Sequence, residues 1–101
     1  MDGFSLETPE QVSQTLAARA KALRLAKGWK QITLAQRSGV SLASLRRFEE
    51  SGRISLQSLL ELAFALNRLD DFDLLLQPPP ASSLAELEAA EERPARKRGR
   101  I

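Results

Sequence analysis

Residue types that carry chemistry in many proteins are missing from this chain, which has neither cysteine nor histidine. Without cysteine it forms no disulfide framework and no thiolate metal site. Without histidine it lacks the imidazole that binds zinc and the most common general acid–base group. We therefore expect no metal site and no cofactor, and the absence of cysteine fits a reducing cytosol.

Long apolar runs and catalytic motifs are missing as well. The sequence has no apolar run of about 18 residues, the length of a membrane-spanning helix, and its N-terminus does not have the layout of a signal peptide. It also lacks a glycine-rich phosphate loop, and its serines have no histidine to activate them. We expect a cytoplasmic protein that is not an enzyme.

What the chain does have is charge that is segregated along its length. Residues 19–53 carry a net charge of +7, residues 68–92 a net charge of −6, and residues 93–101 a net charge of +5, although the whole chain carries only +2. A strongly basic first half is the electrostatic footprint of a protein with a polyanionic partner such as nucleic acid.

The most informative segment is residues 28–54, which holds two short helical patterns separated by a single glycine. In the first pattern, residues 30–38, apolar side chains fall on one side of two helical turns. Gly39 then lies where the chain must turn sharply, and glycine adopts a positive φ at little steric cost. Ser41 is a good N-cap for the second helix. This arrangement is typical of a helix-turn-helix.

The second helix, residues 42–50, divides its side chains between a buried and an outward side. Leu45 and Phe48 are three positions apart and are expected to face the core. The outward residues are Leu42, Ala43, Ser44, Arg46 and Arg47. Because arginine binds guanine through two hydrogen bonds, an exposed helix with two adjacent arginines is well suited to the major groove of DNA.

At these positions the chain resembles the lambda repressor/Cro-like helix-turn-helix family, also called the XRE type. The matching residues are Gln31, Leu34, Ala35, Gly39, Val40, Ser41, Leu45, Phe48, Glu49 and Gly52. The resemblance covers roughly residues 10–76 and implies an all-α, five-helix DNA-binding domain. It implies that Gln31 contacts a phosphate or braces the recognition helix, and that Glu49 ties the end of that helix to backbone or to an arginine. Leu42 stands where glutamine or arginine is common, so its contact with DNA would be apolar.

Basic residues beside the motif extend the expected DNA-binding surface. Each of four basic residues on the first helix or just after it is expected either to contact a phosphate or to be simply exposed to solvent: Lys21, Arg24, Lys27 and Lys30. Taken with the resemblance, the residues that we expect at the DNA are Lys30, Gln31, Ser41, Leu42, Ala43, Ser44, Arg46 and Arg47.

The chain divides into four parts. These are an N-terminal arm at residues 1–8, the helix-turn-helix domain at 9–77, a proline-rich linker at 78–82, and a short acidic helix with a disordered basic tail at 83–101. Three consecutive prolines cannot continue a helix and form a stiff spacer. The tail is too charged to pack, so we expect it to be flexible.

Two further helices are expected in the domain besides the helix-turn-helix pair. Thr8 begins a capping box for a first helix that extends from Pro9 to about Lys27. Ser55 caps a fourth helix that Asn67 ends. The residues expected to close the core from that helix are Leu56, Leu59, Leu60, Ala63 and Leu66.

The segment at residues 69–76 is open to two interpretations. It can form a short fifth helix that buries Leu69, Phe72, Leu75 and Leu76, or an extended edge that pairs with a second subunit, and the helix is favoured. In either form so apolar a segment at the end of a small domain is an expected homodimer contact. The N-terminal arm is the alternative dimer contact.

The residues after the prolines need a function of their own, because they carry no fold-defining pattern. A lambda-repressor-like domain followed by a proline spacer, an acidic helix and a basic end is similar to antitoxins of Hip-type modules. That resemblance implies a repressor that controls its own operon and neutralises a Ser/Thr-kinase toxin. The alternative is a stand-alone, phage-like repressor without a toxin. The tail residues expected to contact the partner or DNA are Arg93, Arg96, Lys97, Arg98 and Arg100.

Overall fold

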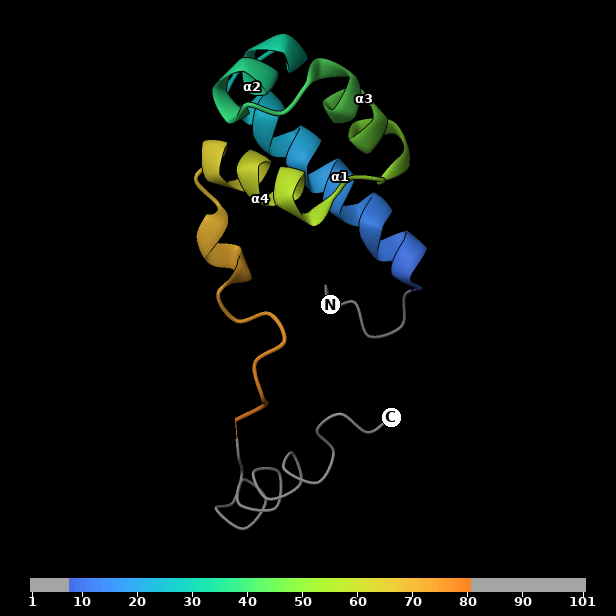
Figure 1. Cartoon of the computed structure of the whole chain (residues 1–101), viewed down its shortest axis with the longest axis vertical. Coiled ribbons are helices and arrows are strands. Elements are labelled where there is room, and N and C mark those ends of the chain that lie inside the picture. Colours follow the sequence, from blue (N-terminus) through green and yellow to red (C-terminus); the bar gives the residue numbers. More distant parts are fainter. Residues whose placement is uncertain (1–7, 81–101) are drawn as a thin grey trace.

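Helices account for most of the computed structural model, which describes residues 8–80 (Figure 1). They are α1 (Pro9–Ala26), α2 (Gln31–Ser38), α3 (Leu42–Ser51), α4 (Leu56–Ala65) and a short 3₁₀ helix, η1 (Leu69–Phe72). None of these helices is long and apolar enough to cross a membrane. The predicted N-terminal arm before Thr8 and the predicted acidic helix and basic tail at 83–101 lie outside the described residues.

Side-chain caps fix where three of the four α-helices begin. The Thr8 hydroxyl accepts from the Gln11 backbone N–H at 3.1 Å, and the Gln11 side chain accepts from the Thr8 N–H at 2.9 Å, so the predicted capping box is confirmed. Ser41 and Ser55 cap α3 and α4 in the same way, each hydroxyl accepting a backbone N–H at 3.1 Å. Helix α2 differs because its N-cap residue, Lys30, makes no side-chain cap.

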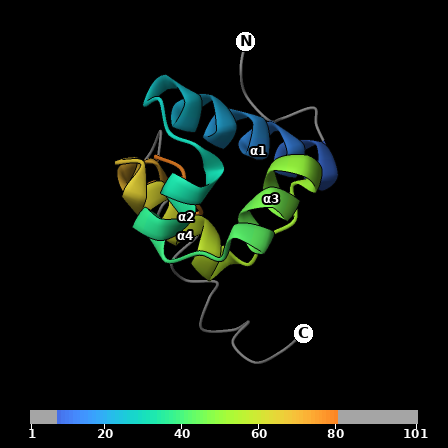
Figure 2. The same cartoon turned by 90° about the horizontal axis from the view of Figure 1, so that it is seen from above.

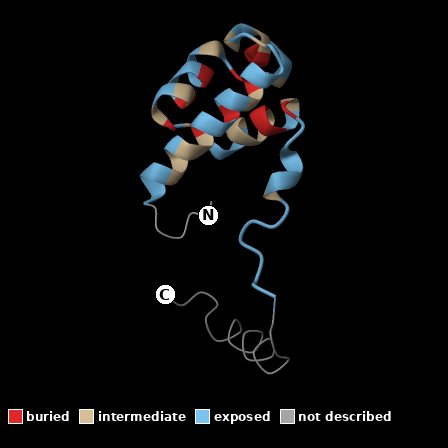
Figure 3. Ribbon diagram, turned by 180° about the vertical axis from the view of Figure 1, so that it is seen from behind, coloured by how far each residue is buried: buried red, intermediate tan, exposed pale blue. Residues whose placement is uncertain are grey.

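The core lies where α1, α2, α3 and α4 meet (Figures 2 and 3). Helix α3 packs against α1 and α2, and α2 also packs against α4. The largest fully buried side chains are Leu34, Leu45, Phe48 and Leu62. Each such side chain contributes about 1.5–3 kcal/mol through burial. The prediction that Leu45 and Phe48 face the core is confirmed.

The prediction for the buried side of α4 is partly wrong. Leu62, which the sequence did not single out, is fully buried, whereas Leu56 is 67 % exposed. The helix carries leucines on more than one side, so two helical stripes fit the pattern equally well. Packing against α2 selects the stripe that contains Leu62, Ala63 and Leu66.

The predicted fifth helix is wrong in extent and in burial. Only residues 69–72 form a helix, a single 3₁₀ turn without a side-chain cap, and turns follow it. Leu69 and Leu75 are exposed, Phe72 is half-buried, and Leu76 is fully exposed at a positive φ. So short a helix is not stable without packing, and its contact with α4 leaves Leu69, Leu75 and Leu76 exposed. The alternative of an extended edge is not observed either, since residues 69–80 form no strand.

Two glycines end neighbouring helices in the same left-handed conformation, but their surroundings differ. Gly39 ends α2 at φ +80° and Gly52 ends α3 at φ +81°. A Cβ at Gly39 would meet no atom within 4 Å, whereas a Cβ at Gly52 would lie 2.9 Å from the backbone carbonyl carbon of Ser13 in α1. The end of α3 therefore lies directly on the backbone of α1.

We predict that Gly52→Ala destabilises the domain by about 1–3 kcal/mol more than Gly39→Ala, because overpacking adds to the strain. Both variants share the left-handed backbone strain, about 1–2 kcal/mol. Urea unfolding of the full chain, followed by circular dichroism, measures both values. Equal losses of stability in the two variants would contradict the close approach of α3 to α1.

Candidate nucleic-acid interface

Helix α3 presents a polar outer side that is backed by the core. Leu45 and Phe48 anchor the helix from within, while Ala43, Ser44, Arg46 and Arg47 are exposed along its outer side. At its start, the Ser41 hydroxyl donates to the Ser44 hydroxyl at 2.9 Å. The structure thus brings five of the predicted DNA-contacting residues together on one exposed helix and its cap. These are Ser41, Ala43, Ser44, Arg46 and Arg47.

Leu42 requires a correction. The sequence predicts that it points away from the core, but it is half-buried and packs against the core cluster. As the first residue of α3, it lies one turn before Leu45 and Arg46, between the inner and the outer side of the helix. Only part of its side chain is therefore available to DNA.

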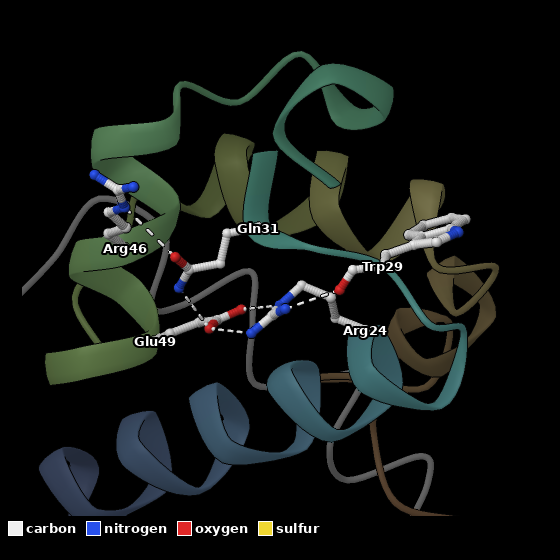
Figure 4. A network of polar contacts seen from close by, with 5 residues as sticks. All are labelled: Arg24, Trp29, Gln31, Arg46 and Glu49. Carbon is white, nitrogen blue, oxygen red and sulfur yellow. Dashed lines mark hydrogen bonds and ion pairs between the residues drawn. The ribbon is translucent and has the colours of Figure 1, made fainter. Parts of the chain in front are cut away.

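A buried ion pair holds α3 to α1 (Figure 4). The Arg24 guanidinium donates from Nε to Glu49 Oε2 at 2.8 Å and from Nη2 to Glu49 Oε1 at 2.9 Å. Its third group, Nη1, donates to the backbone carbonyl of Trp29 at 2.9 Å. Both side chains are almost fully buried. The prediction that Glu49 ties the recognition helix to an arginine is confirmed, whereas the prediction of Arg24 as a phosphate contact is wrong.

Gln31, the first residue of α2, joins this ion pair to the outer side of α3. Its Nε2 donates to Glu49 Oε1 at 2.9 Å, and its Oε1 accepts from Arg46 Nε at 3.4 Å. Of the two roles that the resemblance implies for Gln31, the structure shows the bracing of the recognition helix. The polar chain therefore connects α1, α2 and α3 through side chains alone (Figure 4).

Opposing effects act on the pKa of Glu49. Burial raises this pKa, but hydrogen bonds from Arg24 and Gln31 and the positive charges of Arg24 and Lys21 lower it by more. The net pKa lies below the ordinary value, so Glu49 is ionised at neutral pH and accepts hydrogen bonds only. Among the described residues, no buried side-chain nitrogen or oxygen lacks a hydrogen-bond partner.

Two cationic side chains lie over the ring of Trp29. The sequence marked Trp29 only as an apolar residue. The Lys27 ammonium lies 5.2 Å and the Arg37 guanidinium 4.5 Å from the centre of its ring, so both make cation–π contacts. Lys30 is exposed at the start of α2, next to the Trp29 carbonyl that Arg24 binds. No sequence pattern indicated this cluster, because Lys27 and Arg37 are ten residues apart and meet only through the ring.

The predicted dimer residues lie apart from α3, on the C-terminal side of α4 (Figure 1). Leu69 lines a groove together with Leu60 and Phe64 of α4. Phe64 is 70 % exposed, and the apolar side chains of residues 74–76 are exposed as well. An apolar surface therefore exists where the sequence predicted a dimer contact, although its residues are not buried in the single chain.

We predict that Glu49→Gln lowers the free energy of unfolding at pH 7 by about 3 kcal/mol, because it leaves the buried Arg24 without its counter-charge. The folded-state pKa of Glu49 is depressed, so its stabilising effect is complete above the unfolded value, about 4.3, and is lost as pH falls through the folded value. The wild type and the variant should therefore converge in acid. Urea unfolding between pH 7 and pH 3 measures the difference.

The matched control is Glu50→Gln, which removes the same charge from the exposed neighbour. This change should alter the stability by less than about 0.5 kcal/mol. The role of the ionised carboxylate would be contradicted if the difference in free energy of unfolding between the wild type and Glu49→Gln stayed constant down to pH 3.

Comparison with known proteins places this geometry in a family. A family model described as helix-turn-helix matches residues 21–72, just over half of the chain. Curated proteins give no match, and neither do solved structures. The matched segment contains α2, α3, α4 and the ion pair between Arg24 and Glu49. The chain therefore belongs to the XRE-type, lambda repressor/Cro-like helix-turn-helix family of DNA-binding transcription regulators.

Proposed function

We propose that this protein is a sequence-specific transcriptional repressor that binds its operator as a homodimer, with α3 in the major groove. The observation that carries the proposal is the outer side of α3. It is exposed and carries two arginines, and a buried ion pair fixes the helix that presents it. In helix-turn-helix proteins the second helix enters the groove and its first residues meet the base edges.

The residues at this surface divide into two roles. Arg46 and Arg47 supply the donors for base or phosphate contacts, and Ser41, Ala43 and Ser44 are small enough to let the start of α3 approach the DNA closely. The exposed part of Leu42 offers an apolar contact to a thymine methyl. Lys30 and Gln31 lie at the start of α2, where uncapped backbone N–H groups and a positive dipole favour a phosphate.

A homodimer doubles this contact. Two copies of α3 would lie about 34 Å apart, facing successive major grooves on one side of the duplex. We place the dimer contact at Leu69, Phe72, Leu75 and Leu76, and the exposure of this apolar surface in the single chain supports that choice. The predicted contact through the N-terminal arm lies outside the described residues.

We predict that the double variant Arg46→Ala, Arg47→Ala loses operator binding at moderate salt, because each arginine that reads a base contributes about 1–3 kcal/mol. Fluorescence anisotropy with the operator duplex measures the affinity. The operator itself comes from selection of the full-length protein on a randomised duplex pool.

The control removes one exposed positive charge elsewhere, whereas the double variant removes two. Arg68 is exposed beyond the end of α4 and pairs with Asp71 at 3.0 Å, so Arg68→Ala should leave operator affinity within about twofold, as expected for a cation that makes no phosphate contact. Unchanged binding by the double arginine variant would rule out α3 as the reading helix.

We further propose that the protein is the antitoxin of a Hip-type module, which represses its own operon and neutralises a Ser/Thr-kinase toxin. Support comes from the layout of the chain, in which the family domain precedes three prolines, an acidic segment and five cations among the last nine residues. Folding onto a protein partner would give these residues a role that the domain does not require. The alternative is a stand-alone repressor whose tail adds affinity for DNA.

We predict that truncation after Gln77 abolishes binding of the kinase toxin while operator binding stays intact. The test co-expresses the chain, full-length or truncated, with a Hip-type Ser/Thr-kinase toxin and measures co-purification after nuclease treatment. Two results together would favour the stand-alone repressor. The truncated chain would bind the operator more weakly and with a shallower salt dependence, and no protein would co-purify with the full chain. The salt slope would then fall by about one for each phosphate that the tail neutralises in the full chain.

A further inference from the structure

We infer that Gln31 determines how Arg46 contacts a base of DNA. Gln31 holds the Nε side of the Arg46 guanidinium, so Arg46 meets a guanine through its two Nη groups. This inference deepens the proposed function and rests on it. It concerns specificity at one base position, which the presence of an arginine on α3 does not define by itself.

Glu49 fixes the orientation of the Gln31 side-chain amide. Glu49 Oε1 receives a hydrogen bond from Gln31 Nε2 at 2.9 Å and another from Arg24 Nη2 at 2.9 Å. An ionised carboxylate has no proton to donate, so only the amide N–H of Gln31 can face it. The ion pair is nearly fully buried and bidentate, and it therefore keeps the Glu49 carboxylate in place.

This orientation determines which atom Gln31 presents to Arg46. With its nitrogen turned to Glu49, Gln31 must present its oxygen on the other side, where Arg46 Nε lies 3.4 Å away (Figure 4). An oxygen attracts the guanidinium, whereas a flipped amide would present N–H groups and repel it. In the free protein this hydrogen bond is long and lies at an exposed site. Exclusion of water by DNA lowers the local dielectric and strengthens the bond.

The hydrogen bond to Gln31 leaves the two Nη groups of Arg46 as free donors. Arginine can offer either the pair Nε and Nη or the pair of Nη groups to two acceptors. Since Nε is engaged by Gln31, the two Nη groups are left to face outward, and they match the O6 and N7 acceptors of guanine. Arg47 is exposed on the same helix but makes no hydrogen bond to Gln31, so both of its donor pairs remain available.

The test uses selection of full-length proteins on a randomised duplex DNA pool, followed by affinity measurements on single-base variants of the selected site. The proteins are the wild type, Gln31→Met, Arg46→Ala, Arg47→Ala and the double variant Gln31→Met, Arg46→Ala. Methionine has a similar length to glutamine but cannot accept the Arg46 hydrogen bond. Thermal unfolding of each variant shows that it is folded at the temperature of the assay.

We expect Gln31→Met to reduce the preference for guanine by about tenfold at the position that Arg46→Ala also affects, and nowhere else. In the Arg46→Ala background the same change should have no further effect at that position, and the position read by Arg47 should keep its preference. An unchanged preference in Gln31→Met would overturn the inference. A uniform loss over all sequences that adds to the effect of Arg46→Ala would also overturn it, because Gln31 would then contact a phosphate.

A measurement on the free protein separates this inference from the proposed function. The Nε–H of Arg46 should exchange with solvent several-fold more slowly than that of Arg47 in nuclear magnetic resonance spectra, and Gln31→Met should remove the difference. Equal exchange in the wild type would overturn the positioning of Arg46. If the wild type selects no DNA sequence while the exchange difference is present, the proposed function fails although the contact in the free protein exists.

Discussion

The ion pair between Arg24 and Glu49 is the interaction on which the DNA-binding surface depends. Removing two charges from water costs several kcal/mol for each ion, and the pair recovers this cost only because every polar atom in it is matched. The carboxylate accepts three hydrogen bonds, two from Arg24 and one from Gln31, and the third arginine donor ends on the Trp29 carbonyl. An apolar pair of the same volume would lack the directional hydrogen bonds by which Arg24, Glu49 and Gln31 connect three helices.

The apolar core explains why such a specifying contact is useful in so small a domain. Four large side chains are fully buried, and α1 adds two buried alanines, Ala17 and Ala20, to the core. Alanines allow helices to approach closely but do little to define their rotation. The rotation of α3 is set instead at two points on α1, where Gly52 lies against the backbone of Ser13 and where Glu49 meets Arg24. Glu49 lies in the C-terminal half of α3 and Gly52 is its C-cap, so the N-terminal half of the helix is free to approach DNA.

What the sequence predicted correctly is mostly local. Thr8, Ser41 and Ser55 indicate helix starts because a cap needs only a hydroxyl and the next turn, and Gly39 indicates the turn after α2 because glycine adopts a positive φ. Each of these features is complete within a few residues. This is why the helix-turn-helix could be located from the sequence alone, and the family match at residues 21–72 agrees with it.

The errors all involve contacts between distant segments. Arg24 resembles its exposed basic neighbours in the sequence, and only Glu49, 25 residues later, makes its burial favourable. The buried side of α4 depends on the packing of α2, which its leucine pattern does not encode uniquely. The segment at 69–76 has helical spacing, but in the single chain only Phe72 is half-buried, and Leu69, Leu75 and Leu76 stay exposed. Periodicity therefore predicted helices well but could not determine which neighbour each helix would meet.

The same distinction between local and distant contacts separates the two arginines of α3. Arg46 and Arg47 are adjacent in sequence and both exposed, so they have the same local character. Their difference comes from Gln31, fifteen residues before Arg46, and from the buried carboxylate that orients it. A long side chain that is already restrained loses less conformational entropy when it binds than one that is free. The buried network thereby gives one of two identical side chains a preferred direction before any DNA is present, which makes Arg46 the better suited of the two to select a base.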